Sequence, residues 1–269
     1  MTPPIISVLS DVREALNRAR LVSLSLDFDG TLVPLDPNPE APYLDAETLE
    51  TLEQLSTRPH LRISLVSGRA VEDLYRRVRL EGLIYAGNHG LEIFGRGISF
   101  VEPNASLHRE GLANLCRDLT QRLRPLAGTA VEYKGLTATV HYRHTDVTDL
   151  TELHEAVRAA VTRAGTSFRV QPGDRALEIL PVSNWSKGAA VRWINQQLGA
   201  DRVECIYIGD GSTDEQVFQL LPEAITIRIG SAPASSARHQ LPDRDRVLQF
   251  LQWLGIQGTP RSLRTPAAS

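Results

Sequence analysis

The chain has 269 residues and a formal net charge of −3, with 42% apolar and 23% charged residues. This composition is typical of a folded protein, and the small negative charge argues against a dedicated nucleic-acid-binding protein. The two cysteines, Cys116 and Cys205, exclude a disulfide framework and are compatible with a reducing cytoplasm. No apolar run approaches the roughly 20 residues of a membrane span, and we expect no secretory signal at residues 1–10.

Short apolar runs divide the first and last parts of the chain. Four of them are rich in β-branched residues, and they span residues 21–26, 62–66, 203–208 and 225–229. Continuous apolar runs of this length are typical of parallel strands that helices cover on both faces. The first three runs end at a polar residue, which predicts functional side chains at the strand ends.

Helical patterns lie between the predicted strands. One apolar stripe follows a candidate N-cap at Asp45, and another ends at Gly199, a typical stop residue. The stripes consist of Leu49, Leu52 and Leu55, and of Val191, Ile194 and Leu198. Strands that alternate with helices predict an α/β fold with a doubly wound, Rossmann-like parallel sheet.

The middle of the chain follows a different pattern. Two helical stripes, each followed by two strand-like runs, predict an αββαββ unit. The stripes and runs span, in order, residues 112–123, 129–134, 136–143, 150–161, 167–171 and 175–180, with the last turn at Pro172–Gly173. We expect an inserted α+β domain at residues 104–180 within a core formed by 1–103 and 181–257. Residues 258–269 are predicted to be a disordered tail.

The first candidate functional motif is Asp27–Thr31 (DFDGT), directly after a predicted strand. Ligands of open α/β sheets bind at the carboxyl ends of the strands, so two carboxylates there are placed for chemistry. Asp27 and Asp29 are suited to act as a nucleophile and a proton carrier, and Gly30 permits a tight turn between them and the next element. An ordinary acidic turn is the structural alternative.

Two further motifs suit an anion. Ser67–Arg69 (SGR) follows another strand, where a hydroxyl and free backbone N–H groups could bind a phosphate oxygen. Lys187 opens a predicted helix, where the helix dipole does not favour a cation, and this conflict indicates an anionic partner. A turn and a solvated surface lysine are the structural alternatives.

The fourth motif is Gly209–Glu215 (GDGSTDE), after the third of the four predicted strands. Its small residues permit a close loop, and its carboxylates are the ligands that Mg²⁺ prefers. Alternatively, Asp214 and Glu215 would stabilise the first turn of a helix.

Taken together, the four motifs resemble those of the haloacid dehalogenase-like phosphatase superfamily. The resemblance implies that Asp27 is the nucleophile and Asp29 the general acid/base. Ser67 and Gly68 match the phosphate-binding segment, and Lys187 matches the lysine that neutralises the phosphate.

The same resemblance implies a Mg²⁺ site. Asp27, Asp210 and Asp214 match its acidic residues, and the backbone carbonyl of Asp29 is a further ligand in the superfamily. A carboxylate that attacks a dianionic phosphate needs such help, because two like unit charges at 4 Å repel by roughly 4 kcal/mol at a dielectric constant near 20. Mg²⁺ and Lys187 would oppose this repulsion.

The inserted domain resembles the cap of trehalose-6-phosphate phosphatases. The segments that carry the likeness are Ala86–Glu92 (AGNHGLE), Val131–Lys134, His141–Arg143 and Gly173–Pro181. The resemblance implies that the substrate-binding residues are Asn88, His89, Glu132, Lys134 and Glu178. On structural grounds alone, His89 could be a buried core histidine, and the cap residues could be exposed strand positions.

The chain departs from that family at two positions. Ser186 and Gly211 stand where the family usually has aspartate. Neither change removes a residue to which chemistry is assigned.

The resemblance implies a cytoplasmic, Mg²⁺-dependent phosphatase that hydrolyses trehalose 6-phosphate, a small-molecule sugar phosphate, through an aspartyl-phosphate. We expect it to be monomeric, with no nucleic-acid or membrane partner. Phosphatases of glucosylglycerol phosphate, mannosyl-3-phosphoglycerate or sucrose phosphate are alternatives, and so is a non-catalytic sugar-phosphate sensor. A receiver-type phospho-acceptor domain is disfavoured because it needs no cap.

Overall fold

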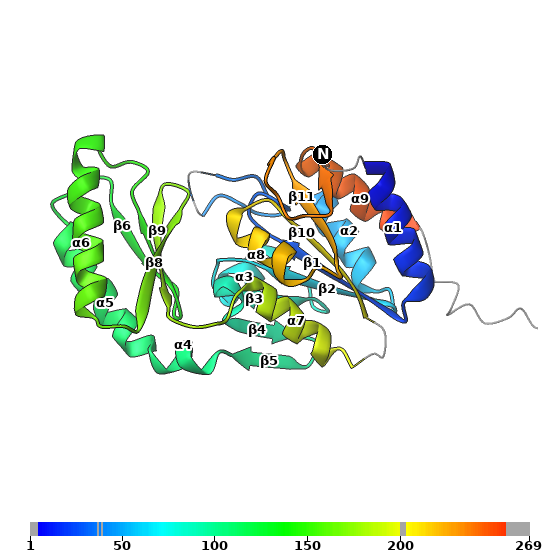
Figure 1. Ribbon diagram of the computed structural model, residues 1–269, viewed down its shortest axis with the longest axis horizontal. Coiled ribbons are helices and arrows are strands. Elements are labelled where there is room, and N and C mark those ends of the chain that lie inside the picture. The colour runs from blue at the N-terminus through cyan, green and yellow to red at the C-terminus, as the bar shows by residue number, and fades with distance from the viewer. Residues whose placement is uncertain (1–4, 37, 39, 200–202, 257–269) are drawn as a thin grey trace, which may run out of the picture. The chain divides into compact units, whose positions relative to one another are not determined.

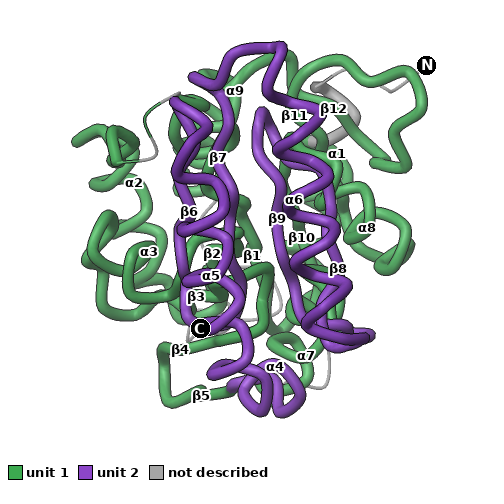
Figure 2. Tube along the Cα trace, turned by 90° about the vertical axis from the view of Figure 1, so that its left-hand side faces the viewer, with its two compact units in different colours: residues 1–100, 185–269 green, residues 101–184 purple. Residues whose placement is uncertain are grey.

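The computed structural model describes residues 5–36, 38, 40–199 and 203–256, so the predicted tail at 258–269 lies outside the described residues. The chain divides into two compact units. Unit 1 consists of Met1–Phe100 and Trp185–Ser269, and unit 2 is Val101–Asn184 (Figure 2).

Unit 2 extends three residues before and four residues after the insert expected at 104–180. Hydrogen bonds hold these additional residues. The backbone N–H of Val182 donates to the carbonyl of Ser167 at 2.8 Å, and Asn104 Nδ2 donates to the carbonyl of Val182 at 2.7 Å.

Unit 1 contains an eight-stranded sheet in the order β12-β11-β10-β1-β2-β3-β4-β5 (Figure 1). The pairs from β12 to β3 are parallel, and β3 pairs with β4 in the antiparallel direction. The strands are β1 (Leu21–Asp27), β2 (Leu61–Val66), β3 (Ile84–Gly87), β4 (Glu92–Gly95), β5 (Ile98–Val101), β10 (Val203–Gly209), β11 (Ile225–Ile229) and β12 (His239–Leu241).

Helices cover both faces of this sheet, as the predicted doubly wound α/β fold requires. One hydrophobic cluster joins the sheet to α1, α2, α3 and α9, and another joins it to α7 and α8. The helices are α1 (Ile5–Arg18), α2 (Ala46–Ser56), α3 (Val71–Val78), α7 (Lys187–Gln197), α8 (Ser212–Leu220) and α9 (Arg244–Ile256). No helix in the described part of the chain is both long and apolar enough to cross a membrane.

The order of the strands determines where functional residues collect. The chain moves from β1 to β2 on one side, whereas β10 pairs with β1 on the other side, so the direction of winding changes at β1. Asp27 pairs with Val66, and Leu26 pairs with Ile208, so the three strands end at the same level. Crevices at such a reversal are the usual ligand sites of open α/β sheets.

Unit 2 contains a four-stranded antiparallel sheet in the order β6-β7-β9-β8. Its helices α5 and α6 pack on one face through a separate apolar cluster that includes Leu119 and Val157. The short elements α4 (Pro103–Leu107), η2 (Val147–Asp149) and, in unit 1, η1 (Asn88–Gly90) complete the fold. The remaining elements are α5 (Arg109–Leu123), β6 (Ala130–Tyr133), β7 (Ala138–His141), α6 (Leu150–Arg163), β8 (Phe168–Gly173) and β9 (Ala176–Pro181).

The last turn of unit 2 differs from the prediction. Pro172 and Gly173 belong to β8 and pair with Leu177 and Ala176, so the turn lies two residues later, at 174–175. Proline is tolerated there because β8 is an edge strand, where a missing N–H need not break the sheet.

Candidate active site

Asp27, Lys187 and Asp214 form a buried ionic cluster in unit 1. Lys187 Nζ lies 2.6 Å from Asp27 Oδ1 and 3.0 Å from Asp214 Oδ1. Each of the three residues is at most 5% exposed. The cluster joins the end of β1 to the first residue of α7 and the first turn of α8, which are far apart in the sequence.

Asp210 adds a third carboxylate to this cluster. Oxygen atoms of Asp27, Asp210 and Asp214 all lie within 4.8 Å of one another. The close approach requires Gly30, since a Cβ atom at that position would lie 2.2 Å from Asp210 Oδ2. Gly30 also has a φ of +82°, which residues with a side chain rarely adopt.

The cluster carries more negative than positive charge. Three carboxylates surround one ammonium group, so their formal charge is −2 when all are ionised. Burial and the neighbouring carboxylates raise the pKa of Asp27 well above its usual range, against the opposing effect of Lys187. Burial and Asp214 likewise raise the pKa of Asp210. A site made only of oxygen ligands, with this excess of negative charge, fits a hard divalent cation.

Lys187 stays charged in this setting. Burial lowers its pKa, but Asp214 and Asp27 raise it, and the net direction is upward. The preceding residue places it, because Ser186 is the N-cap of α7 and its Oγ accepts a hydrogen bond from Ala189 N at 3.2 Å. A serine can therefore replace aspartate as the helix cap before this lysine.

Asp214 is held on both of its oxygens. Tyr207 Oη donates to Oδ1 at 2.6 Å, and the backbone N–H of Gly211 donates to Oδ2 at 2.8 Å. Burial and Asp214 raise the pKa of Tyr207 well above its usual value, so its hydroxyl remains a donor. Tyr207 gives no functional signal in the sequence, because it lies inside an apolar strand where a tyrosine is indistinguishable from a packing residue.

Asp29 lies beside the cluster in a different environment. Arg69 binds its carboxylate through Nε and Nη2, at 2.8 and 2.7 Å, and uses Nη1 to bind Asp73 at 3.0 Å. The Ser67 hydroxyl donates to Asp29 Oδ2 at 3.4 Å and accepts a hydrogen bond from the Arg69 backbone N–H at 3.1 Å. Arg69 therefore connects the two predicted motifs at the ends of β1 and β2.

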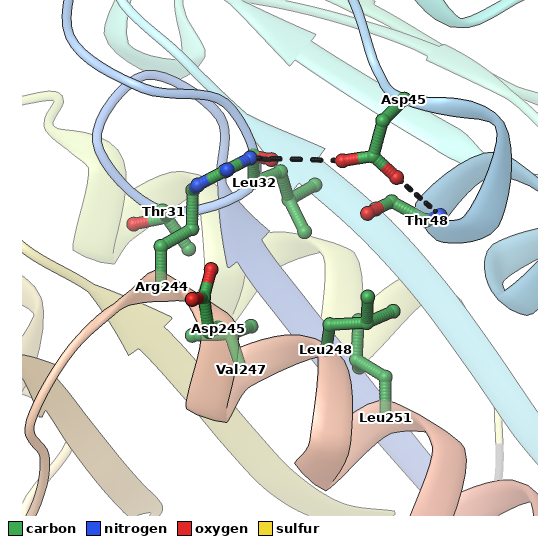
Figure 3. Close-up of a pocket in the computed structure, with 9 residues that line it drawn as sticks. All are labelled: Thr31, Leu32, Asp45, Thr48, Arg244, Asp245, Val247, Leu248 and Leu251. Atoms are coloured by element: carbon green, nitrogen blue, oxygen red, sulfur yellow. Dashed lines mark hydrogen bonds and ion pairs between the residues drawn. The ribbon is translucent and has the colours of Figure 1, made fainter.

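Thr31 and Arg244 fix the loop that carries Asp27 and Asp29. Thr31 is fully buried and donates to Asp27 Oδ2 at 3.4 Å. Arg244, at the start of α9, lines a small cavity of about 30 Å³. Figure 3 shows this residue beside Thr31 and Leu32. Arg244 Nη1 donates to the Leu32 carbonyl at 3.2 Å and lies 3.6 Å from Asp45, the N-cap of α2. A surface arginine 213 residues after the motif offers no sequence signal for this role.

The segment 88–90 packs against the Ser67–Gly68 turn. Asn88 and His89 both have positive φ angles, 49° and 59°, which is strained for residues other than glycine. The His89 backbone N–H donates to the Ser67 carbonyl at 2.8 Å. A Cβ atom on Gly68 would lie 2.8 Å from the His89 ring, so Gly68 is needed for this close contact.

Asn88 is completely buried, and its Nδ2 donates to Glu92 Oε1 at 2.8 Å. The same oxygen of Glu92 accepts the backbone N–H of Val71, the first residue of α3, at 2.8 Å. Glu92 therefore fixes the strained segment to a helix, a role for which the sequence offers no signal.

The other predicted binding residues, Glu132, Lys134 and Glu178, lie in unit 2. Glu132 and Glu178 are cross-strand partners of Thr139, one on each side of it. The backbone N–H of Lys134 donates to the Thr137 carbonyl at 2.9 Å, which closes the turn between β6 and β7.

Comparison with known proteins agrees with the family inferred from the motifs. A family model described as trehalose-phosphatase matches residues 25–244. A probable trehalose-phosphate phosphatase D of Arabidopsis thaliana is 30% identical over 280 residues, 97% of this chain and 74% of the relative. A trehalose-phosphate phosphatase of Mycobacterium tuberculosis is 32% identical over 272 residues, 96% of this chain and 68% of the relative.

The fold has a close match among solved structures. The C-terminal domain of C. albicans trehalose-6-phosphate phosphatase gives a TM-score of 0.79 at 20% identity, covering 95% of this chain and 98% of that one. This likeness confirms the predicted α/β fold. Since the family model spans residues 25–244, which include every motif at the strand ends, the chain belongs to the trehalose-phosphatase family.

Proposed function

We propose that this chain hydrolyses trehalose 6-phosphate to trehalose and inorganic phosphate, through an aspartyl-phosphate on Asp27 and with Mg²⁺ as cofactor. Family membership supports the reaction class. The observation that carries the proposal is the meeting of Asp27, Asp210, Asp214 and Lys187 at the ends of β1 and β10, with Lys187 Nζ 2.6 Å from Asp27.

The three carboxylates of this cluster, with the backbone carbonyl of Asp29, would hold the Mg²⁺ ion. When bound, the ion supplies positive charge that stabilises the phosphoryl group during transfer. The excess of carboxylates over ammonium groups at the cluster supports this assignment.

In the first step, a carboxylate oxygen of Asp27 attacks phosphorus, and the bond from phosphorus to the sugar oxygen breaks. Asp29 gives its proton to that leaving oxygen, so trehalose departs neutral. In the second step, Asp29 takes a proton from water as the water oxygen attacks phosphorus, and the bond to Asp27 breaks. Lys187, Ser67 and the backbone at Gly68 bind the phosphoryl oxygens through both steps.

We propose further that unit 2 selects the substrate as a cap. Glu132, Lys134 and Glu178 would bind the sugar hydroxyls, since carboxylates accept and ammonium groups donate hydrogen bonds. His89 would contribute from unit 1. Asn88, with its amide on Glu92, would shape the segment that presents His89.

Phosphate release tests the proposal directly. We expect trehalose 6-phosphate to be hydrolysed at least ten-fold more efficiently than glucose 6-phosphate, sucrose phosphate, glucosylglycerol phosphate or mannosyl-3-phosphoglycerate. Activity should disappear with a chelator and return with Mg²⁺. Asp27→Asn should abolish turnover, whereas Asp36→Asn, an exposed aspartate in the loop that follows, should retain it.

Other results would identify a different function. Preference for another ester of the panel would change the substrate and keep the chemistry. Binding of trehalose 6-phosphate without phosphate release, in the presence of Mg²⁺, would indicate a sensor.

A further inference from the structure

Four side chains form one row across the sheet of unit 2. Glu132, Thr139, Glu178 and Gln171 are successive cross-strand partners on β6, β7, β9 and β8. Side chains alternate between the faces of a strand, and Val140, the neighbour of Thr139, packs in the apolar cluster with α5 and α6. The row therefore lies on the face opposite these helices.

Both carboxylates of the row are fixed by a side chain from the adjacent strand. Gln171 Nε2 donates to Glu178 Oε2 at 2.7 Å. His141 Nε2 lies 2.8 Å from Glu132 Oε2. Such bonds hold a long carboxylate side chain in one position, which lowers the entropy cost of binding a ligand with it.

Thr139 lies between the two glutamates and has an unsatisfied hydroxyl. The residue is 4% exposed, and its Oγ1 has no hydrogen-bond partner among the described residues. A buried polar atom without a partner destabilises the fold, so its presence beside two carboxylates calls for a polar ligand.

We propose that Thr139 and Gln171 complete a sugar-binding row with Glu132 and Glu178, in which the Thr139 hydroxyl binds a substrate hydroxyl and Gln171 positions Glu178. The inference rests on the proposed function and adds two specificity residues to it. Opposed residues on neighbouring strands are about 5 Å apart, a spacing that suits the hydroxyl groups around one hexose ring. Carboxylate, hydroxyl and amide groups in sequence offer both acceptors and donors to such a ring.

The test compares trehalose 6-phosphate with p-nitrophenyl phosphate, which carries the same ester group without a sugar. The readout is the ratio of kcat/KM for the two esters. We expect Thr139→Val, which has the same shape without the hydroxyl, to lower this ratio about ten-fold, and Thr139→Ser to restore it. Thr162→Val, at an exposed position on α6, should leave the ratio unchanged.

Gln171→Leu removes the donor to Glu178 while keeping a similar volume. We expect it to raise the KM for trehalose 6-phosphate about ten-fold with little change in kcat, since the positioned group binds sugar rather than the reacting phosphate. Gln121→Leu, at an exposed site on α5, is the matched control.

The outcomes separate the two proposals. If the wild-type chain prefers trehalose 6-phosphate but the Thr139 and Gln171 variants leave both the ratio and the KM unchanged, the row is refuted and the proposed function stands. If the variants lose kcat/KM equally toward both esters, the residues have a structural role and the sugar-binding row is also refuted. If the wild-type chain hydrolyses p-nitrophenyl phosphate and not trehalose 6-phosphate, the proposed function fails and the row fails with it.

Discussion

Gly30 has no room for a side chain in the loop that carries Asp27 and Asp29. A Cβ atom there would overlap Asp210, and the φ of +82° disfavours any side chain. We predict that Gly30→Ala lowers kcat/KM for p-nitrophenyl phosphate at least 100-fold, because Asp210 must move out of the acidic cluster.

Gly97→Ala is the control for this substitution. Gly97 has nearly the same φ, +79°, with no atom within 4 Å of an added Cβ. Gly97→Ala therefore has the conformational cost of about 1–2 kcal/mol without a collision, and its activity should stay near the wild-type value. Equal activity of the two variants would show that the contact with Asp210 is unimportant.

Asp73 makes the stability of unit 1 depend on pH. Burial raises its pKa, but hydrogen bonds from Arg77, Arg76 and Arg69 lower it more, to about 2. The folded pKa is thus below the unfolded value near 3.9, so the stabilisation is complete above that pH and is lost as pH falls toward 2. The difference corresponds to about 2–3 kcal/mol at neutral pH.

We predict that Asp73→Asn lowers the free energy of unfolding by about 2–3 kcal/mol at pH 7 and by about half as much at pH 3. Urea unfolding of both proteins at each pH measures the difference. A gap that stays constant with pH would contradict the assignment of this stabilisation to the Asp73 carboxylate.

At the scale of single elements, α7 depends on its first residues. Its N-cap, Ser186, fixes the helix start that carries Lys187 into the acidic cluster. We predict that Ser186→Ala costs about 1 kcal/mol of stability, because a backbone N–H loses its partner. Ser186→Asp, which restores a capping oxygen, should stay within about 0.5 kcal/mol of the wild type, and thermal unfolding distinguishes the two.

Strand β8 shows what an edge position allows. Its Pro172 would remove a hydrogen bond from a central strand, yet the strand continues through Gly173 to the turn. A proline–glycine pair normally marks a turn, so the sequence favoured the wrong position. The correct one depends on strand order, which local sequence does not contain.

At the scale of the whole molecule, the two units have separate cores. The apolar cluster around Leu119 contains only residues of unit 2, and the clusters around Leu52 and Val191 contain only residues of unit 1. The acidic cluster belongs to unit 1. Stabilising either unit should therefore leave the intrinsic stability of the other unchanged.

We predict two calorimetric transitions that respond to different changes. Leu119→Ala should lower the temperature of only one transition, because the residue is fully buried in unit 2. The free energy of unfolding of that unit should fall by about 2–5 kcal/mol. Mg²⁺ should raise only the other, since an ion that binds the folded acidic cluster stabilises unit 1. A single transition that moves with both changes would show that the units unfold together.

Most of the side chains proposed for catalysis could be placed from the sequence because they adjoin the end of an apolar run. Asp27, Ser67 and Asp210 then come together once the strands are parallel, and Lys187 comes with its helix start. The bonds from Tyr207 to Asp214 and from Arg244 to Leu32 were not predictable, since they depend on the packing of distant elements. Strand β12, with three residues, is too short to show the alternation of apolar and polar residues that predicts a strand.

The hydrogen bond from Asn104 to Val182 joins residues near the two ends of unit 2, which spans Val101–Asn184. A segment whose ends meet can be excised and its flanks bridged by a short loop without stretching the chain that remains. Exchanging this segment for another domain would therefore leave the acidic cluster of unit 1 in place, and if the proposed function holds, it would change which ester is accepted without changing the reaction.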